Sequence, residues 1–583
     1  MAYQPLDTHR NQIRLLHIQP GRFEETPRCT VSTVSLDDKP VYEALSYVWG
    51  TLNDTVPIIF ENKPVEVTRN LDRALRHIRY PDRERVIWND ALCINQPDIP
   101  ERNAQVARMN VLYSKASRVV IFLGEEGEDG GIATEFFQEM SRNPDLHLDP
   151  SKSPHVEIYG LSWGDSGLTK AIARFFSRPW WQRVWTVQEF ILAEDIVFQI
   201  GNRSLPGSLM LTFDRVFAKH SLGCCYQSFR SLFDVDEKSF STMAFGLENL
   251  QDFPALHKNR STVPFADILL RYKNRECYDP RDKIYGMLGL ASEEIVSLIK
   301  PDYTTPASQV YENAALTIMR KYGNMDIMSH IIDGPSRMPN LPSWVPDWSA
   351  KVDPILYNSY IIRTGTMANF NASGSRPLQI ENPAPGVCAT PSILIDTIQA
   401  IGEQNKSGQA VPASWPVVAK AFGNAPYMGS HSSRWVAFLQ TVCGGTPLYD
   451  GRNFRRCPDN KLDVEMMSDW LAHKSNGLDV KSKDYANAVG CAVKGRRVFL
   501  SRNGYIGLAP ASAKEGDIVA VFPGAKVPFI LREALETEDH EMQGVSQRSH
   551  YRVVGDGYVH GIMDGEAFRD NSMGSKVRDI ILI

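Results

Sequence analysis

Long apolar runs are missing from this chain of 583 residues. Its longest apolar runs, such as 119–123, have the length of a strand, whereas a helix that spans a bilayer needs about 20 apolar residues. Residues 1–30 mix acidic, basic and apolar side chains, so they lack the apolar core of a secretory signal. These absences predict no stable membrane insertion. They indicate a cytosolic or nuclear protein, and we predict a cytoplasmic location.

Neither sign of charge dominates the sequence. The 63 Lys and Arg residues nearly balance the 68 Asp and Glu residues, which leaves a net charge of −5. A protein that mainly binds nucleic acid carries a basic surplus to neutralise phosphates, and this chain has none. We therefore predict no nucleic-acid partner. The length exceeds what one hydrophobic core serves, which predicts about two to four domains.

The nine cysteines form no CxxC pair and show no Cys/His spacing typical of a zinc site. They are scattered, with Cys224 and Cys225 adjacent. This pattern predicts neither a disulfide framework nor a metal site, and we expect no bound cofactor. A phosphate-binding GxxxxGK[ST] loop is also absent from the sequence, which excludes an NTPase of that type.

Between about residues 40 and 205, short apolar runs alternate with helical periodicity. That alternation is typical of a parallel sheet wrapped by helices. The stretch from 125 to about 165 begins acidic and glycine-rich and has little periodicity, so it is interpreted as a polar insertion. The pattern predicts strands at 44–48, 85–90, 118–124 and 196–200. It predicts helices at 71–78, 168–178 and 181–193, and one that opens with a capping box of Asp98 and Glu101 and runs to 116.

The character of the chain changes after this α/β region. Strand-like runs separated by Gly, Pro and Asn predict a small antiparallel β barrel or sandwich at the C-terminus. The predicted organisation is an N-terminal extension (1–40), an α/β domain (41–210), a helical connecting region (211–363), a linker or exposed loop (364–390), a mixed region (391–484) and a β-rich domain (485–583).

The segment 181–189 (WQRVWTVQE) sets a carboxylate beside a tryptophan-rich stripe. On one continuous helix Trp181, Trp185 and Gln188 share a face, with Glu189 at its margin. None of the residues three or four positions from Glu189 is basic. The carboxylate therefore needs a tertiary partner, solvation at a cleft or a raised pKa.

Three motifs follow one another over about 150 residues: 42–50 (YEALSYVWG), 88–96 (WNDALCINQ) with Glu101 and Gln105, and 183–189 (RVWTVQE). In sequence and order they resemble the fungal heterokaryon incompatibility (HET) domain family. Asn89 stands where the family usually has an apolar strand residue. The segments 279–289, 504–507 and 560–566 are similar to segments that commonly follow the domain.

The resemblance implies a role in the cell-death reaction that follows fusion of genetically different fungal cells. It also implies a parallel sheet of the Toll/interleukin receptor-like, flavodoxin-like type. The stretch 45–50 is similar to the first-strand motif of those domains, and 185–189 to a helix whose glutamate is catalytic in members that cleave NAD. The implied partners are further copies of this chain or other incompatibility proteins, with NAD as a candidate substrate.

Release of nicotinamide from NAD passes through an oxocarbenium-like sugar, which needs a nearby carboxylate and an aromatic wall for the leaving ring. Glu189 with Trp185 or Trp49 would supply these parts. Ligands of open α/β sheets bind beyond the carboxyl ends of the strands, where we expect Ser46 to Gly50 and Asp90. Asp90 would bind ribose hydroxyls or orient Glu189.

Other interpretations of these residues stay open. Glu189 and Gln188 would equally serve to bridge backbone groups beside core tryptophans, in a non-enzymatic adaptor that self-associates. Cys93 follows a strand and is a second candidate nucleophile. Ser162 lies in 160–164 (GLSWG), which matches a hydrolase elbow, although residues 165–167 interrupt the helix that an elbow requires.

Overall fold

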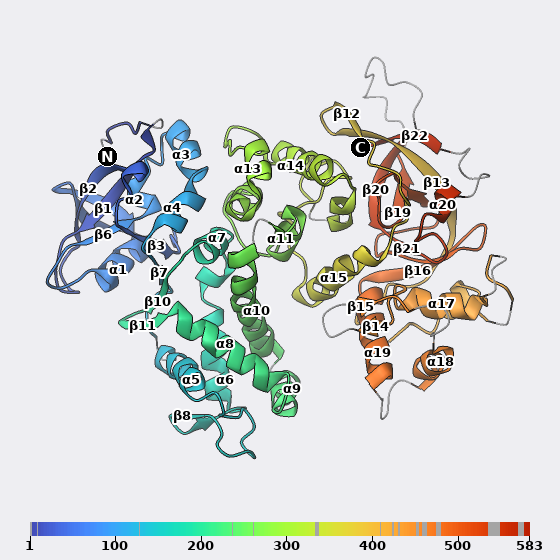
Figure 1. Cartoon of the computed structure of the whole chain (residues 1–583), viewed down its shortest axis with the longest axis horizontal. Coiled ribbons are helices and arrows are strands. Elements are labelled where there is room, and N and C mark those ends of the chain that lie inside the picture. Colours follow the sequence, from blue (N-terminus) through green and yellow to red (C-terminus); the bar gives the residue numbers. More distant parts are fainter. Residues whose placement is uncertain are drawn as a thin grey trace. The chain divides into compact units, whose positions relative to one another are not determined.

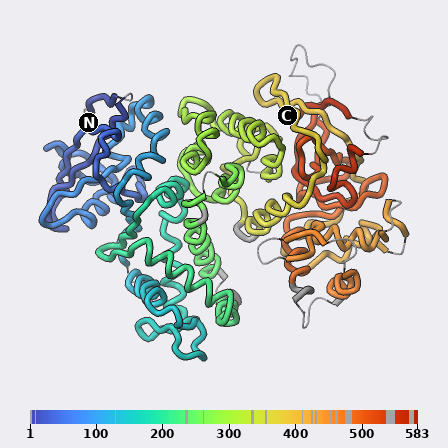
Figure 2. Tube along the Cα trace, in the orientation of Figure 1, coloured from blue at the N-terminus to red at the C-terminus, as the bar shows by residue number. Residues whose placement is uncertain are grey.

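The computed structural model describes residues 3–7, 10–127, 129–235, 237–259, 262–332, 337–408, 410–422, 425–428, 432–449, 454–457, 463–473, 480–534, 549–569 and 577–583. They belong to two compact units (Figures 1 and 2). The N-terminal unit comprises Met1–Ile268 with Arg275–Thr304, and the C-terminal unit comprises Leu269–Asn274 with Thr305–Ile583.

A mixed sheet of nine described strands is the centre of the N-terminal unit, in the order β11-β10-β7-β3-β6-β1-β2-β4-β5. The α/β class expected from the sequence is thus confirmed. The bounds are β1 (Gln12–Ile18), β2 (Arg28–Ser35), β3 (Glu43–Tyr47), β4 (Thr55–Phe60), β5 (Lys63–Thr68), β6 (Arg85–Trp88), β7 (Arg118–Phe122), β10 (Ile196–Ile200) and β11 (Arg203–Pro206).

Four strands of this sheet form a parallel core: β6, β3, β7 and β10. Counted along the chain, their spatial order is second, first, third, fourth. Doubly wound sheets with this order bind ligands where the strand order reverses, a point that corresponds to the pair β3 and β7 in this sheet. A relation to Toll/interleukin receptor domains stays a prediction.

The predicted parallel sheet is present as a core of four strands, but the whole sheet is mixed because hairpins flank that core. β1 pairs antiparallel with both β2 and β6, and the hairpins β4–β5 and β10–β11 add antiparallel edges. Segment 1–40, predicted as an extension, supplies β1 and β2 to the same sheet. β1 lies inside the sheet, and Ile13, Leu15, Leu16 and Ile18 are all buried.

The predicted helix at 181–193 is broken in the structure. Pro179 begins a 3-10 helix (Pro179–Gln182), and Arg183 is extended, with φ −80° and ψ 144°. The α-helix α7 then runs from Trp185 to Ile191. Proline fixes φ at a value that suits the first turn of a helix, which explains why the 3-10 helix begins at Pro179. The extended Arg183 then separates this short helix from α7. Trp181 is therefore not on the face of α7, and it packs in the core against Phe198.

The stretch predicted as a polar insertion contains a helix, α5 (Gly130–Arg142), whose Phe136 and Phe137 are fully buried. α5 packs against α6 and α8. The described helices of this unit are α1 (Arg69–Ile78), α2 (Asp90–Cys93), α3 (Ile99–Val106), α4 (Met109–Lys115), α5, α6 (Ser166–Phe176), α7, α8 (Gly207–Ser221), α9 (Tyr226–Val235), α10 (Glu237–Asn259), α12 (Asp282–Tyr285) and α13 (Glu293–Leu298), with α11 (Phe265–Arg271) at the boundary of the units.

The C-terminal unit is built on a second sheet, as the β-rich C-terminus predicted. Pairings β13–β18, β18–β19, β19–β20, β20–β22 and β22–β13 close a ring. β13 begins inside the predicted linker 364–390, where it pairs with β12. The bounds are β12 (Glu381–Ala384), β13 (Val387–Ile401), β16 (Arg496–Ser501), β17 (Ile506–Pro510), β18 (Ile518–Val521), β19 (Phe529–Glu533), β20 (His550–Asp556), β21 (Tyr558–Val559) and β22 (Val577–Leu582).

Helices and a short hairpin accompany this sheet, and parts of the predicted mixed region 391–484 lie outside the described residues. The described elements are α14 (Ala307–Tyr322), α15 (Pro354–Thr366), α16 (Trp415–Val418), α17 (Arg434–Val442), β14 (Leu448–Tyr449), β15 (Phe454–Arg455), α18 (Val464–His473), α19 (Val480–Val493) and α20 (Glu566–Arg569). Within the described part of the chain, none of the helices has the length and apolar character that crossing a bilayer requires.

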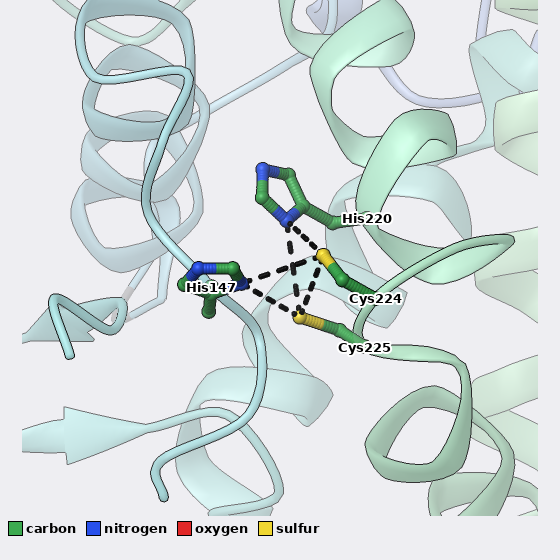
Figure 3. Close-up of side chains that lie close together, drawn as sticks. All are labelled: His147, His220, Cys224 and Cys225. Atoms are coloured by element: carbon green, nitrogen blue, oxygen red, sulfur yellow. Dashed lines mark hydrogen bonds between the residues drawn. The ribbon is translucent and has the colours of Figure 1, made fainter. Parts of the chain in front are cut away.

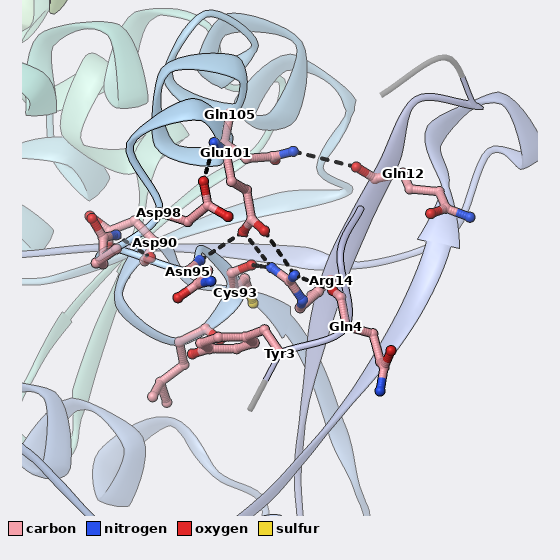
Figure 4. Close-up of polar contacts among 12 residues, drawn as sticks. Tyr3, Gln4, Gln12, Arg14, Asp90, Cys93, Asn95, Asp98, Glu101 and Gln105 are labelled. Atoms are coloured by element: carbon pink, nitrogen blue, oxygen red, sulfur yellow. Dashed lines mark hydrogen bonds and ion pairs between the residues drawn. The ribbon is translucent and has the colours of Figure 1, made fainter. Parts of the chain in front are cut away.

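A buried ion pair attaches the second sequence motif to strand β1 (Figure 4). The Arg14 guanidinium, 2% exposed, lies 2.6 Å from the Glu101 carboxylate. Arg14 also donates to the Cys93 carbonyl at 3.0 Å, and Glu101 accepts the Asn95 amide at 2.7 Å. Asp98 caps α3 as predicted, accepting the Glu101 amide at 3.0 Å. In a capping box Glu101 would also accept the backbone amide of Asp98. Here the Glu101 side chain binds Arg14 instead, and the Asp98 amide donates to the Asn95 carbonyl.

Replacing Arg14 with methionine is expected to destabilise the N-terminal unit by about 3–5 kcal/mol, because the Glu101 charge would stay buried without its partner. Urea unfolding of the full chain measures the effect. Arg10→Met is the matched control, since Arg10 pairs with Asp7 at the surface, where ion pairs contribute at most about 1 kcal/mol. Equal midpoints for the two variants would contradict the assigned role of Arg14.

Candidate functional site

The carboxyl ends of β3 and β6 bring two sequence motifs to one edge of the sheet. Because the two strands are parallel, Ser46 at the end of β3 and Asp90 after β6 lie at the same edge. Trp49 and Gly50 follow directly after β3. This is the location expected for Ser46, Trp49, Gly50 and Asp90.

Ser46 joins the first motif to the third. Its hydroxyl, which has no exposed surface, donates to Glu189 Oε2 at 2.5 Å and accepts the Trp180 indole N–H at 2.7 Å. Glu189 lies on α7 and is 5% exposed. The hydrogen-bond partners that the sequence required for this carboxylate are therefore the hydroxyls of Ser46 and Tyr113.

Trp49 joins the first motif to the second. Its indole N–H donates to Asp90 Oδ2 at 2.8 Å. Gly50 has φ +78°, a conformation that favours glycine, and an added Cβ would lie 3.1 Å from the Asn70 amide. Asn89, the departure from the family pattern, caps α2 by accepting the Leu92 amide at 3.1 Å.

Arg183 is the cation that acts on both carboxyl groups. Its guanidinium donates to the Tyr47 carbonyl at 2.9 Å, and its charge lowers the pKa of Glu189 and of Asp90. Burial acts in the opposite direction and is stronger. It raises the pKa of Glu189 to about 7 and raises that of Asp90, and the charge of Asp90 raises the pKa of Glu189 further. A carboxyl group with such a pKa accepts and donates protons near neutral pH.

Trp185 lies apart from the serine network, against Asp282. The Asp282 carboxylate accepts a hydrogen bond from the Tyr303 hydroxyl at 2.6 Å. Burial raises the pKa of Asp282 to about 6, while the hydrogen bonds from Tyr303 and Trp185 act to lower it. Gly289 approaches Gln188 so closely that an added Cβ would lie 2.5 Å from Oε1. Segment 279–289 therefore packs against the third motif.

Access differs between the two halves of this site. Trp49 and Asp90 are half-buried and Gly50 is exposed, although the Asp90 Oδ1 atom is itself buried and has no hydrogen-bond partner among the described residues. Ser46 and Glu189 are closed off, and Glu189 meets a ligand only after α7 or the chain after β3 moves. The geometry fits a buried structural network as it stands and fits a catalytic carboxylate after opening.

Two other candidates have environments unsuited to nucleophilic chemistry. Cys93 is 1% exposed, and burial raises the pKa of its thiol to about 12, so it stays protonated. Ser162 lies in the two-stranded hairpin β8 (Glu157–Ile158) and β9 (Leu161–Ser162), and α6 begins only at Ser166. An elbow needs the helix to start at the serine, so Ser162 lacks that geometry.

Comparisons with known proteins agree with the three motifs. Residues 42–189 match the family model of the heterokaryon incompatibility protein (HET) domain, and residues 457–575 match that of the Het-6 beta-barrel domain. The chain is 25% identical to heterokaryon incompatibility protein 6, OR allele, of Neurospora crassa, over 95% of this chain and 94% of the relative. No solved structure matches. The family resemblance is thereby confirmed.

The raised pKa of Glu189 predicts a pH-dependent stability. A carboxyl that is protonated in the fold and ionised when unfolded stabilises the fold fully below about pH 4.5, and this contribution is lost as pH rises through about 7. Glu189→Gln never ionises. Relative to the native protein it is expected to gain stability between pH 5 and 8, on the order of 3 kcal/mol. Thermal unfolding of both proteins across this range measures it; a pH-independent difference would contradict the buried, protonated carboxyl.

Proposed function

We propose that this chain, which carries a HET domain, acts in the incompatibility response of a fungus. The proposal is supported by the match to both an incompatibility domain and a Het-6 barrel. It is supported also by the alignment with an incompatibility protein over nearly the whole of both chains. Fusion of cells that differ at the recognised locus would be the event to which it responds.

The activity that the site supports best is hydrolysis of the N-glycosidic bond of NAD. The observation that carries this is Glu189, a carboxyl group with a pKa of about 7 beside Asp90, at the edge where open α/β sheets bind ligands. The half-buried Trp49, which is hydrogen-bonded to Asp90, would form an aromatic wall for the nicotinamide ring.

The proposed reaction needs no acid for the leaving group. The pyridinium nitrogen of NAD takes both electrons of the bond to the ribose, so nicotinamide leaves uncharged. The Glu189 carboxylate stabilises the cationic sugar and accepts a proton from the water that attacks it, while Asp90 binds the ribose hydroxyls. The products are nicotinamide, ADP-ribose and one proton.

The closed arrangement around Glu189 would then be a resting state. Breaking the Ser46–Glu189 hydrogen bond and opening the edge would be coupled to self-association. A second candidate follows from the same closure. If the network never opens, the domain is a non-enzymatic adaptor whose motifs hold the fold.

Nicotinamide release by the purified full chain, concentrated enough to self-associate, distinguishes the two functions. Glu189→Gln is expected to lower the rate by about 10²–10⁴-fold, because it removes the group that accepts the proton. Glu194→Gln, which alters an exposed carboxylate just after α7, is the matched control and should keep the native rate.

The same variants in fungal cells test the response itself. If the chain is an enzyme, fused cells that carry the Glu189→Gln variant should stay viable. If it is an adaptor, the native chain should release no nicotinamide and the Glu189→Gln variant should give an undiminished response. No response from the native chain would overturn the proposed role in incompatibility.

A further inference from the structure

Four side chains that bind metals converge in the N-terminal unit, outside the Ser46–Glu189 network (Figure 3). His147 lies between α5 and β8, and His220 is in the last turn of α8. Cys224 and Cys225 precede α9. Their ligand atoms all lie within 4.8 Å of one another. Local spacing gave no sign of this group, because His147 is 77 residues from Cys224.

Five of the six separations are close to the edges of a zinc tetrahedron, and the sixth, between the two histidine nitrogens, is within 4.8 Å. Zinc–sulfur bonds of about 2.3 Å and zinc–nitrogen bonds of about 2.0–2.1 Å imply S–S edges of about 3.8 Å and S–N edges of about 3.5 Å. The two sulfurs are 3.8 Å apart. His147 Nδ1 is 3.4 Å from each sulfur, and His220 Nδ1 is 3.2 and 3.8 Å from them.

The other ring nitrogen of His220 fixes which of its atoms faces the sulfurs. Nε2 lies 2.8 Å from the Pro144 carbonyl oxygen, which accepts hydrogen bonds only. Nε2 therefore carries the proton, and Nδ1 presents its lone pair to the centre of the cluster. Such a second hydrogen bond is the usual support of a metal-binding histidine.

The backbone folds the two cysteines back onto His220. The Cys225 amide donates to the His220 carbonyl at 2.9 Å, which closes a tight turn after α8. At Gly223 an added Cβ would lie 2.6 Å from the Lys219 carbonyl oxygen, so this turn requires glycine. His220 and Cys225 are buried, His147 is half-buried and Cys224 is exposed, which leaves a path for an ion to enter.

We propose that His147, His220, Cys224 and Cys225 bind a structural Zn²⁺ ion. Two thiolates and two neutral imidazoles make the bound site electrically neutral, which suits its partial burial. Binding releases the two thiol protons to solvent. With four protein ligands the ion has no open position, so the site is structural rather than catalytic. It joins the segment before β8 to the α8–α9 turn.

Zinc content of the purified full chain tests the proposal. About one Zn²⁺ per chain is expected by elemental analysis, and Cys225→Ser and His147→Gln should each lose it. Cys277→Ser and His155→Gln are matched controls, because these residues lie outside the cluster, and they should keep the ion. Replacement by Co²⁺ should give the intense visible bands of a tetrahedral site and a thiolate charge-transfer band.

A measurement on the native chain covers the case in which a ligand variant does not fold. Chelation of zinc is expected to expose two thiols to an alkylating reagent, mapped by mass spectrometry to 224 and 225, and to lower the melting temperature. A chain without zinc, bound iron in its place, a disulfide between Cys224 and Cys225, or zinc retained by both ligand variants would overturn the proposal. These readouts do not depend on NAD, so they are independent of the proposed hydrolysis.

Discussion

The arrangement of the N-terminal unit depends on the two hydrogen bonds of the Ser46 hydroxyl. Fully buried, this hydroxyl has hydrogen bonds on both sides, to Trp180 and to Glu189. A buried hydroxyl or carboxyl without such partners would cost several kcal/mol, so β3, the 3-10 turn and α7 are held in one register. Together with the Trp49–Asp90 hydrogen bond, these contacts join three motifs that lie far apart in sequence.

Burial links the acid strength of Glu189 to its accessibility. In the closed arrangement desolvation outweighs the Ser46 hydrogen bond and the Arg183 charge, and the pKa lies near 7. Water entering an opened site would remove most of that desolvation, so the group would release its proton as it meets a ligand. Near neutral pH the closed state therefore contains both the protonated and the ionised carboxyl, whereas an opened state would be mainly ionised, as the proposed hydrolysis requires.

The predictability of this structure from sequence depended on whether the signal was local. Strands β3, β6, β7 and β10 were predicted because they are apolar runs bounded by polar residues. Helix α5 was not predicted, since its buried Phe136 and Phe137 sit in a polar stretch. Pairing between distant residues was equally hidden: Arg14 with Glu101, Ser46 with Glu189, and His147 with the cysteines. Such pairs exist only once the chain is folded.

The ring of strands in the C-terminal unit cannot close until strand β22 has been synthesised. The ring of strands closes only when residues 577–582 pair with both β13 and β20. The N-terminal sheet, in contrast, needs nothing beyond residue 206. A growing chain can thus form its first sheet while the ring still lacks a strand, because domains fold as they leave the ribosome. During that interval β13 and β20 present unpaired edges, which are open to pairing with another chain.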